Sequence, residues 1–268
     1  MPSPTSFAEL NGVLADLVDG LRSILGDDLV GVYLQGSAAI GDFDEHSDAD
    51  FVVVVEDELA PEKVAALRVM HHRVFDCGEE WAKHLEGSYF PRATLRDPAA
   101  AGTELWYLDN GHRDLERSSH CNTLVVRWTL RELGVTLAGP PPDTLVDPFP
   151  TAALQTEIAA VIEHWGNEIL SNPGPYRNRF YQTFIMLNFA RMLHDLQAGS
   201  INSKRTAAEW AKRTLDPSWH DLFDRAWAGR PDPARSVRTP ADPDDFARTL
   251  EFVRYVMDEA EDTPAAGF

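Results

Sequence analysis

Two aspartates with one residue between them, Asp48 and Asp50, stand at the start of the apolar run 51–55, which holds four valines. Because side chains alternate along a strand, both carboxylates point to the same face. Adjacent carboxylates repel each other unless a cation lies between them, and Mg²⁺ prefers such oxygen ligands. Eleven residues before Asp48 stands Ser37, preceded by Gly36, where a backbone can approach a phosphate closely. The pattern predicts a magnesium site that holds nucleotide phosphates, which is the chemistry of nucleotidyl transfer.

A small sheet must hold these residues in place. Strands are expected at 32–34 and at 51–55, and a further strand at 83–90. An opening helix precedes the first strand, with a capping box expected at 6–9, and a second helix is expected to begin at Pro61. Strands and helices in this order predict a mixed α/β sheet.

The chain is expected to change character near residue 150. The proline-rich stretches 139–142 and 147–150 cannot continue a helix, and the pattern beyond them is helical almost throughout. The sequence therefore predicts an α/β catalytic domain over residues 1–150 and an all-α helical bundle over residues 151–268. Helices of the second domain are expected at 152–170, 178–197, 206–214, 218–228 and 244–261, with a proline-rich loop at 230–245.

Composition narrows the possible partners. The 24 Lys and Arg against 43 Asp and Glu give a net charge of -19. This field disfavours nucleic acid, which is bound through cations at its phosphates, and favours a cationic partner, although solubility alone also explains it. The cysteines, Cys77 and Cys121, form no C-x-x-C pair, which argues against disulfides and against a zinc site. No apolar run of about 18 residues and no basic leader occur, so a cytoplasmic protein without membrane contact is expected.

The stretch 34–41 followed by 47–51 resembles the nucleotide-binding motif of the polymerase-β-type nucleotidyltransferase superfamily. The resemblance implies nucleotide contacts at Gly36, Ser37 and Ser47. It also implies ATP as co-substrate and Mg²⁺ as cofactor.

A third carboxylate lies on a neighbouring strand in that superfamily. The resemblance points to Glu86, in the expected strand 83–90, as the general base for an attacking hydroxyl or as a shared metal ligand. Glu79 and Glu80 are nearby alternatives, but they follow Gly78 in a predicted turn, so no strand fixes their direction.

The second half resembles the C-terminal helical domain of the aminoglycoside 3''- and 9-adenylyltransferases, the streptomycin and spectinomycin resistance enzymes. The resemblance rests on Leu187, Arg191, Gly199, Ile201, Lys204 and 208–211, and on 137–140 and 147–148 at the domain junction. It implies that the nucleotide lies between the two domains, with Arg191 and Lys204 at its phosphates and Trp227 nearby. Two alternative interpretations remain open. Lys204 can be a solvated residue ahead of a capping box at 206–209, and Trp227 can be a core residue.

Members of this family that accept streptomycin carry a tryptophan shortly after the Glu-Leu pair matched by 104–105, and an aspartate at the helix start matched by Asn178. Here Trp106 stands several residues before the expected place, near Asn110, and the segment 174–179 holds no acid. Spectinomycin, another aminocyclitol or an amino sugar is therefore expected rather than streptomycin.

The sequence thus predicts an ATP- and Mg²⁺-dependent O-adenylyltransferase that moves AMP to a hydroxyl of a small cationic, aminoglycoside-like molecule, with a monomer favoured. Acidic candidates for the substrate's ammonium groups are Glu104, Asp109, Asp114 and Glu116. The histidines, His71, His72, His112, His120 and His164 among them, show no metal-binding spacing and are expected at the surface or in the core. Two alternatives stay open: an antitoxin-type enzyme that adenylylates a partner protein, and a nucleotide-binding sensor without catalysis.

Overall fold

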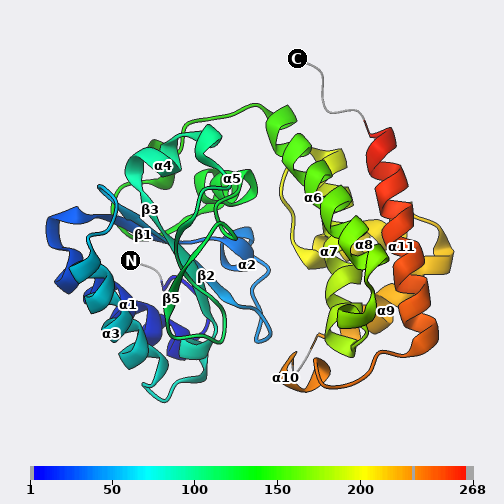
Figure 1. Ribbon diagram of the computed structural model, residues 1–268, viewed down its shortest axis with the longest axis horizontal. Coiled ribbons are helices and arrows are strands. Elements are labelled where there is room, and N and C mark those ends of the chain that lie inside the picture. The colour runs from blue at the N-terminus through cyan, green and yellow to red at the C-terminus, as the bar shows by residue number, and fades with distance from the viewer. Residues whose placement is uncertain (1–2, 231–232, 264–268) are drawn as a thin grey trace. The chain divides into compact units, whose positions relative to one another are not determined.

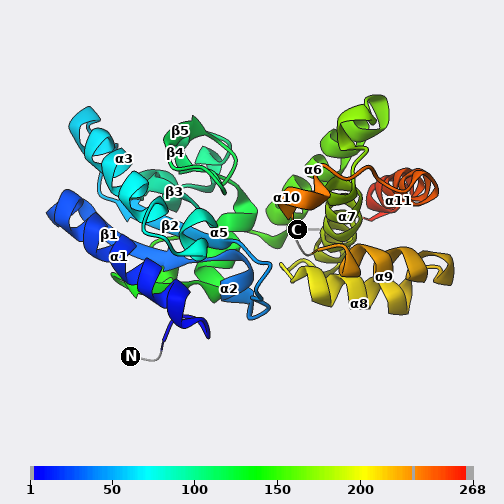
Figure 2. The same cartoon turned by 90° about the horizontal axis from the view of Figure 1, so that it is seen from below.

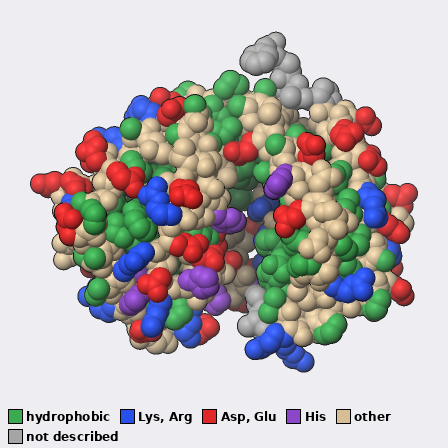
Figure 3. Space-filling model, in the orientation of Figure 1, with side chains coloured by type: hydrophobic (Ala, Val, Ile, Leu, Met, Phe, Trp, Pro, Cys, Tyr) green, Lys and Arg blue, Asp and Glu red, His purple; other side chains and the backbone are tan. Residues whose placement is uncertain are grey.

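The computed structural model describes residues 3–230 and 233–263. Between Phe149 and Pro150 the chain divides into two compact units, and the boundary expected at residue 150 lies at this junction (Figure 1). Acidic side chains are spread over the visible face of both units, as the net charge of -19 requires (Figure 3). Within the described ranges, no helix is long and apolar enough to cross a membrane.

The first unit is built on a mixed sheet of six strands in the order β5-β4-β3-β2-β1-β6. β2 and β3 run parallel, and the other neighbouring pairs are antiparallel. The strands are β1 (Leu29–Leu34), β2 (Ala49–Val55), β3 (Leu85–Pro91), β4 (Leu105–Leu108), β5 (Leu115–Ser118) and β6 (Val135–Ala138). The three strands expected from the sequence are confirmed as β1, β2 and β3, and they form the centre of the sheet.

Helices cover both faces of this sheet. On one face α1 (Ala8–Leu25) and α3 (Pro61–Phe75) lie side by side and pack on Phe51 and Val53 of β2 (Figure 2). On the other face α4 (Arg92–Arg96) and α5 (Leu124–Leu133) pack on Val52 and Val54. Burial of β2 on both faces explains its unbroken valine run. The short helix α2 (Gly36–Ile40) follows β1.

Of the two helix starts predicted in this unit, the one at Pro61 is confirmed and the one at 6–9 is wrong. Pro61 occupies the first turn of α3, as expected, because the missing N–H of proline costs nothing there. The capping box at 6–9 is wrong. The N-cap of α1 is Phe7, whose side chain makes no cap, and the Phe7 N–H instead donates to Thr5 Oγ1 at 3.2 Å. Ser6 therefore stands before the N-cap residue and not at it.

The second unit is a bundle around α7 (Arg179–Ala198), which packs against α6 (Thr151–Ser171), α8 (Lys204–Thr214), α9 (His220–Ala228) and α11 (Pro243–Asp262). Buried apolar side chains on successive turns of α7 explain its central place. The five helices expected here are confirmed, with each end within two residues of its predicted position. One short helix, α10 (Pro233–Ser236), lies in the segment expected to be a loop.

The capping box expected at 206–209 is also wrong. Helix α8 begins at Lys204, and its N-cap is Ser203, whose Oγ accepts a hydrogen bond from the Thr206 N–H at 3.0 Å. Lys204 therefore stands in the first turn of the helix rather than ahead of it.

Candidate active site

The carboxylates predicted for metal binding gather where β2 and β3 begin. Asp50 and Glu86 are partners in the parallel register of these two strands. Asp48 lies just before β2, and its Oδ1 accepts a hydrogen bond from Asn110 Nδ2 at 2.8 Å and lies 3.8 Å from His84 Nδ1. Parallel pairing of β2 with β3 thus brings the third carboxylate to the aspartate pair.

Gly36 lies directly against the Asp50 carboxylate. A Cβ at this position would stand 2.0 Å from Asp50 Oδ2, and the backbone φ of +58° is one that other residues rarely adopt. The neighbouring Gln35 N–H donates to the Asp50 carbonyl at 3.0 Å, which fixes the approach. Ser37 follows on α2, and in the described chain its hydroxyl makes no hydrogen bond.

Ser47 closes the turn that leads to Asp48. Its hydroxyl donates to Asp44 Oδ1 at 3.0 Å and accepts from the Asp44 N–H at 3.0 Å. The structure thus gives this hydroxyl a role inside the turn, where it orients the following aspartate.

Glu86 is deeply set, with 16% of its side chain exposed. The Tyr107 hydroxyl lies 2.7 Å from Glu86 Oε1 and 2.9 Å from Asp109 Oδ1. His120 Nε2 lies 3.6 Å and Cys121 Sγ 3.7 Å from the same Oε1 atom. All these partners approach one oxygen of the carboxylate, so the other oxygen is left for a ligand.

Burial raises the pKa of Glu86 above its ordinary value. The hydrogen bond from Tyr107 and the charge of His120 oppose this shift, while the nearby charges of Asp48 and Asp109 add to it. A carboxyl whose pKa is raised toward neutrality takes a proton from a hydroxyl more readily than an ordinary one.

Sequence reasoning missed Tyr107 and Asn110, which lie on or after the short strand β4. Trp106, the tryptophan considered for substrate contact, lies on the opposite side of β4 from Tyr107. Its ring packs below the guanidinium groups of Arg68 and Arg117, at 5.5 Å and 5.4 Å. Asn110 bonds to Asp48 near the place where the tryptophan is expected. Alternation along β4 is the signal that separates the two aromatic rings, although a four-residue strand shows it weakly.

The four acidic residues predicted as candidates for binding a substrate ammonium group do not form one cluster. Asp109 lies beside Glu86 through the shared Tyr107 hydroxyl. Asp114 instead accepts a hydrogen bond from His72 of α3 at 2.6 Å. Glu104 and Glu116 are exposed. Asp109 is therefore the candidate that the fold places at the carboxylate cluster.

Arg191 and Lys204 belong to neighbouring helices of the second unit. Arg191 on α7 donates to Asn188 Oδ1 at 3.0 Å. The Lys204 ammonium lies 5.1 Å from the centre of the Phe184 ring, also on α7. Packing of α7 on α8 thus brings both cations onto one helix pair.

Asp195 fixes the loop that leads to Lys204. Its Oδ1 accepts hydrogen bonds from the backbone N–H and the side-chain amide of Asn202, at 2.8 Å and 3.1 Å. Burial raises the pKa of Asp195 to about 7, against the opposing effects of Arg191 and Asn202. A buried carboxyl therefore anchors the start of α8.

Trp227 is half-buried. Its ring lies between two guanidinium groups, 4.9 Å from Arg205 and 4.5 Å from Arg230. Both guanidinium groups lie at cation–π distance from the ring, so charged as well as apolar side chains pack against Trp227.

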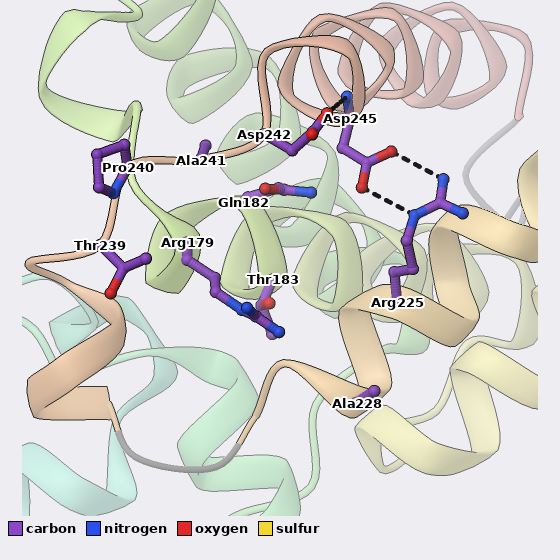
Figure 4. Close-up of a pocket in the computed structure, with 10 residues that line it drawn as sticks. All are labelled: Arg179, Gln182, Thr183, Arg225, Ala228, Thr239, Pro240, Ala241, Asp242 and Asp245. Atoms are coloured by element: carbon purple, nitrogen blue, oxygen red, sulfur yellow. Dashed lines mark hydrogen bonds and ion pairs between the residues drawn. The ribbon is translucent and has the colours of Figure 1, made fainter.

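A separate pocket of about 470 Å³ lies within the second unit (Figure 4). The guanidinium of Arg225 and the carboxylate of Asp245 face each other there through two hydrogen bonds of 2.8 Å, so their charges offset each other. Its other lining residues are Arg179, Gln182, Thr183, Ala228, Thr239, Pro240, Ala241 and Asp242. None of the predicted nucleotide contacts lines this pocket.

The carboxylate cluster fits Mg²⁺ by its donor chemistry. Asp48 and Asp50 supply hard oxygen ligands, and the missing Cβ of Gly36 leaves room for the Asp50 carboxylate in this place. The residues that would hold the ion are thus Asp48 and Asp50, with Glu86 on the adjacent strand.

Comparisons with known proteins identify two matching domain families and a similar fold. Residues 14–75 match the model of the nucleotidyltransferase domain, and residues 144–259 match the model of the aminoglycoside adenylyltransferase C-terminal domain. The fold is similar to that of spectinomycin adenyltransferase AAD(9) from Enterococcus faecialis, solved with ATP and spectinomycin. That similarity has a TM-score of 0.67 at 14% identity and covers 93% of this chain and 98% of the other. Comparison with curated protein sequences finds no match.

The two family models follow each other in the order that the fold requires, a nucleotidyltransferase domain and then the helical domain found in aminoglycoside adenylyltransferases. The chain is an enzyme of the nucleotidyltransferase class, and its residues 144–259 match the C-terminal domain of aminoglycoside adenylyltransferases.

Proposed function

We propose that this protein transfers AMP from ATP to a hydroxyl of a compact aminocyclitol such as spectinomycin. The observation that supports this most is the carboxylate cluster of Asp48, Asp50 and Glu86 in a chain whose second unit matches the aminoglycoside adenylyltransferase domain. The same match favours a small-molecule acceptor over a partner protein.

In the proposed reaction Glu86 accepts the proton of the acceptor hydroxyl through Oε2. The hydroxyl oxygen then forms a bond to the α-phosphorus of ATP, the bond from this phosphorus to the bridging oxygen breaks, and pyrophosphate leaves. Asp48 and Asp50 hold Mg²⁺, which when bound offsets negative charge on the phosphates. Arg191 and Lys204 of the helical unit contact the phosphates and stabilise the leaving group.

The residue near the expected place of the tryptophan supports the choice of substrate. Asn110 takes the expected place of a tryptophan, and Trp106 faces the opposite side of the sheet. Asp109, next to the base, is the proposed partner of an acceptor ammonium group.

Pyrophosphate release with ATP, Mg²⁺ and a set of aminocyclitols and aminoglycosides tests the proposal. Asp50→Asn is expected to abolish release, because it removes a charge that holds the metal, while circular dichroism stays unchanged. Asp57→Asn, an exposed acid at the other end of β2, is the matched control and is expected to keep activity. Release within a few-fold of wild type in Asp50→Asn would contradict the metal assignment, and no release with any acceptor would contradict the proposed reaction.

A further inference from the structure

The side chains of Glu86, His120 and Cys121 bring three different kinds of metal-binding atom close together. Glu86 Oε1 lies 3.6 Å from His120 Nε2 and 3.7 Å from Cys121 Sγ. One ligand atom from each of the three residues lies within 4.8 Å of the other two. No spacing motif indicates this group, because Glu86 comes from β3 and the other two residues follow β5.

The two separations measured from Glu86 Oε1 are close to those that one tetrahedral ion imposes. With metal bonds of roughly 2.0–2.3 Å, ligand atoms of a tetrahedral zinc site stand roughly 3.4 Å apart for oxygen and nitrogen, and roughly 3.6 Å apart for sulfur and oxygen. The distances from Glu86 to His120 and to Cys121 exceed these by a few tenths of an ångström at most. His120 has 69% of its side chain exposed, so it has room to close the remaining gap.

The ligand atoms of this group, an oxygen, a nitrogen and a sulfur, disfavour Mg²⁺. Magnesium prefers oxygen ligands in octahedral geometry, whereas imidazole and thiolate suit Zn²⁺ and Co²⁺. The Tyr107 hydroxyl, 2.7 Å from Glu86 Oε1, supplies the outer hydrogen bond that ligating carboxylates usually receive.

Hydrogen bonds of the Asn122 side chain fix the loop that carries His120 and Cys121. The amide of the buried Asn122 donates to the carbonyls of Ala100 and Thr103, at 3.0 Å and 2.8 Å, and its Oδ1 accepts from the Arg127 guanidinium at 2.6 Å. Every polar atom of the Asn122 side chain is therefore used to fix the loop. A site formed by a fixed loop and a central strand loses little entropy when an ion binds.

We propose that Glu86, His120 and Cys121 form a binding site for a borderline-soft divalent cation of the Zn²⁺ type. The site differs in donor chemistry from the aspartate pair and shares with the reaction only the carboxylate of Glu86. Zn²⁺ bound there occupies the base and inhibits transfer, a consequence that rests on the proposed function, whereas the binding itself does not.

Co²⁺ titration of the tag-free protein, without ATP or acceptor, tests the binding. One equivalent is expected to produce the absorption band of charge transfer from a thiolate to Co²⁺, and Zn²⁺ is expected to remove it by displacement. Cys121→Ser should abolish the band, and Cys77→Ser, at the exposed cysteine, should leave it unchanged.

His120→Ala keeps the test decisive if the buried Cys121 substitution fails to fold. Because the His120 side chain is exposed, this variant removes a ligand without opening the core, and at least about a tenfold loss of Co²⁺ affinity is expected. His112→Ala, at another exposed histidine of the same unit, is the control and should bind Co²⁺ as wild type does. No thiolate band in wild type, a band retained in Cys121→Ser, or unchanged affinity in His120→Ala would overturn the proposal.

Discussion

Glu86 presents its two oxygens to different surroundings. Tyr107, His120 and Cys121 all approach Oε1, and this leaves Oε2 as the oxygen that an acceptor hydroxyl can reach. The Tyr107 hydroxyl thus orients the proposed base without contacting the substrate itself. A single phenolic hydrogen also has to serve two carboxylates, since Asp109 lies within 2.9 Å of the same hydroxyl.

Tyr107→Phe is expected to lower kcat by roughly tenfold to a hundredfold, the effect of losing a hydrogen bond to a charged group, with little change in the KM for ATP. Tyr89→Phe is the matched control. It removes another buried hydroxyl, which lies 2.6 Å from His71 on the opposite face of the sheet, and it should leave kcat unchanged. Steady-state kinetics of pyrophosphate release measure both. Equal losses in the two variants, or a loss in Tyr107→Phe confined to the KM for ATP, would contradict a positioning role.

Asp195 is buried on α7, and its carboxylate binds Asn202 in the loop that leads to Lys204 at the start of α8. Because burial raises the pKa of Asp195 to about 7, far above its value in an unfolded chain, the folded state binds more protons than the unfolded state between these values. This contribution to stability is fully present below about pH 4 and is lost as the pH rises to about 7. The loss amounts to at most about 4 kcal/mol for a shift of roughly three pKa units.

Asp195→Asn is expected to flatten this pH dependence, because the amide keeps an oxygen for Asn202 but does not titrate. Urea unfolding followed by circular dichroism between pH 4.5 and 8 measures the change. The exposed Asp258→Asn is the control and should keep the wild-type slope. A slope in Asp195→Asn equal to that of wild type would show that the carboxyl is not the titrating group.

Lys204→Ala is expected to weaken ATP binding by roughly tenfold to a hundredfold whichever acceptor is present, because a charge-assisted hydrogen bond to a phosphate is lost. Lys212→Ala, on the same helix but paired with Asp224, should have little effect. Calorimetry with a non-hydrolysable ATP analogue and Mg²⁺ compares the two. Unchanged affinity in Lys204→Ala would remove the helical unit from the nucleotide site.

Elements with strong sequence signals were predictable, and short ones were not. The valine run of β2 and the apolar stripes of α1 and α7 identify buried elements directly. β4 and β5 have four residues each, which is too few to show the alternation of apolar and polar side chains. The sequence therefore did not identify Tyr107 as a neighbour of Glu86. The two capping boxes failed because nearby hydroxyls compete for each helix start, and the tertiary structure selects among them.

The whole molecule combines a catalytic sheet that matches nucleotidyltransferases with a helical unit that matches aminoglycoside adenylyltransferases. The phosphate chemistry is expected to reside in the β2 and β3 carboxylates, and the choice of acceptor in the loop after β4. That loop holds Asn110 and Asp109 in place of an aromatic wall.

Expression in a susceptible bacterium is therefore expected to raise tolerance to spectinomycin more than tolerance to streptomycin. A compact aminocyclitol needs neither the tryptophan nor the helix-start aspartate that streptomycin users carry. Minimal inhibitory concentrations measure the difference, with a strain expressing Asp50→Asn as control. Streptomycin tolerance without spectinomycin tolerance would refute the proposed acceptor preference.

The contact between Gly36 and Asp50 also has a genetic consequence. Every missense change of a glycine codon adds a Cβ, and here the added atom would lie 2.0 Å from a carboxylate oxygen. Codon 36 therefore has no allele that leaves this contact unchanged, because even alanine places a Cβ against the Asp50 carboxylate. Under selection for the proposed activity, missense alleles at this codon should be lost as readily as those at the codons of the carboxylates themselves, although glycine carries no side-chain chemistry of its own.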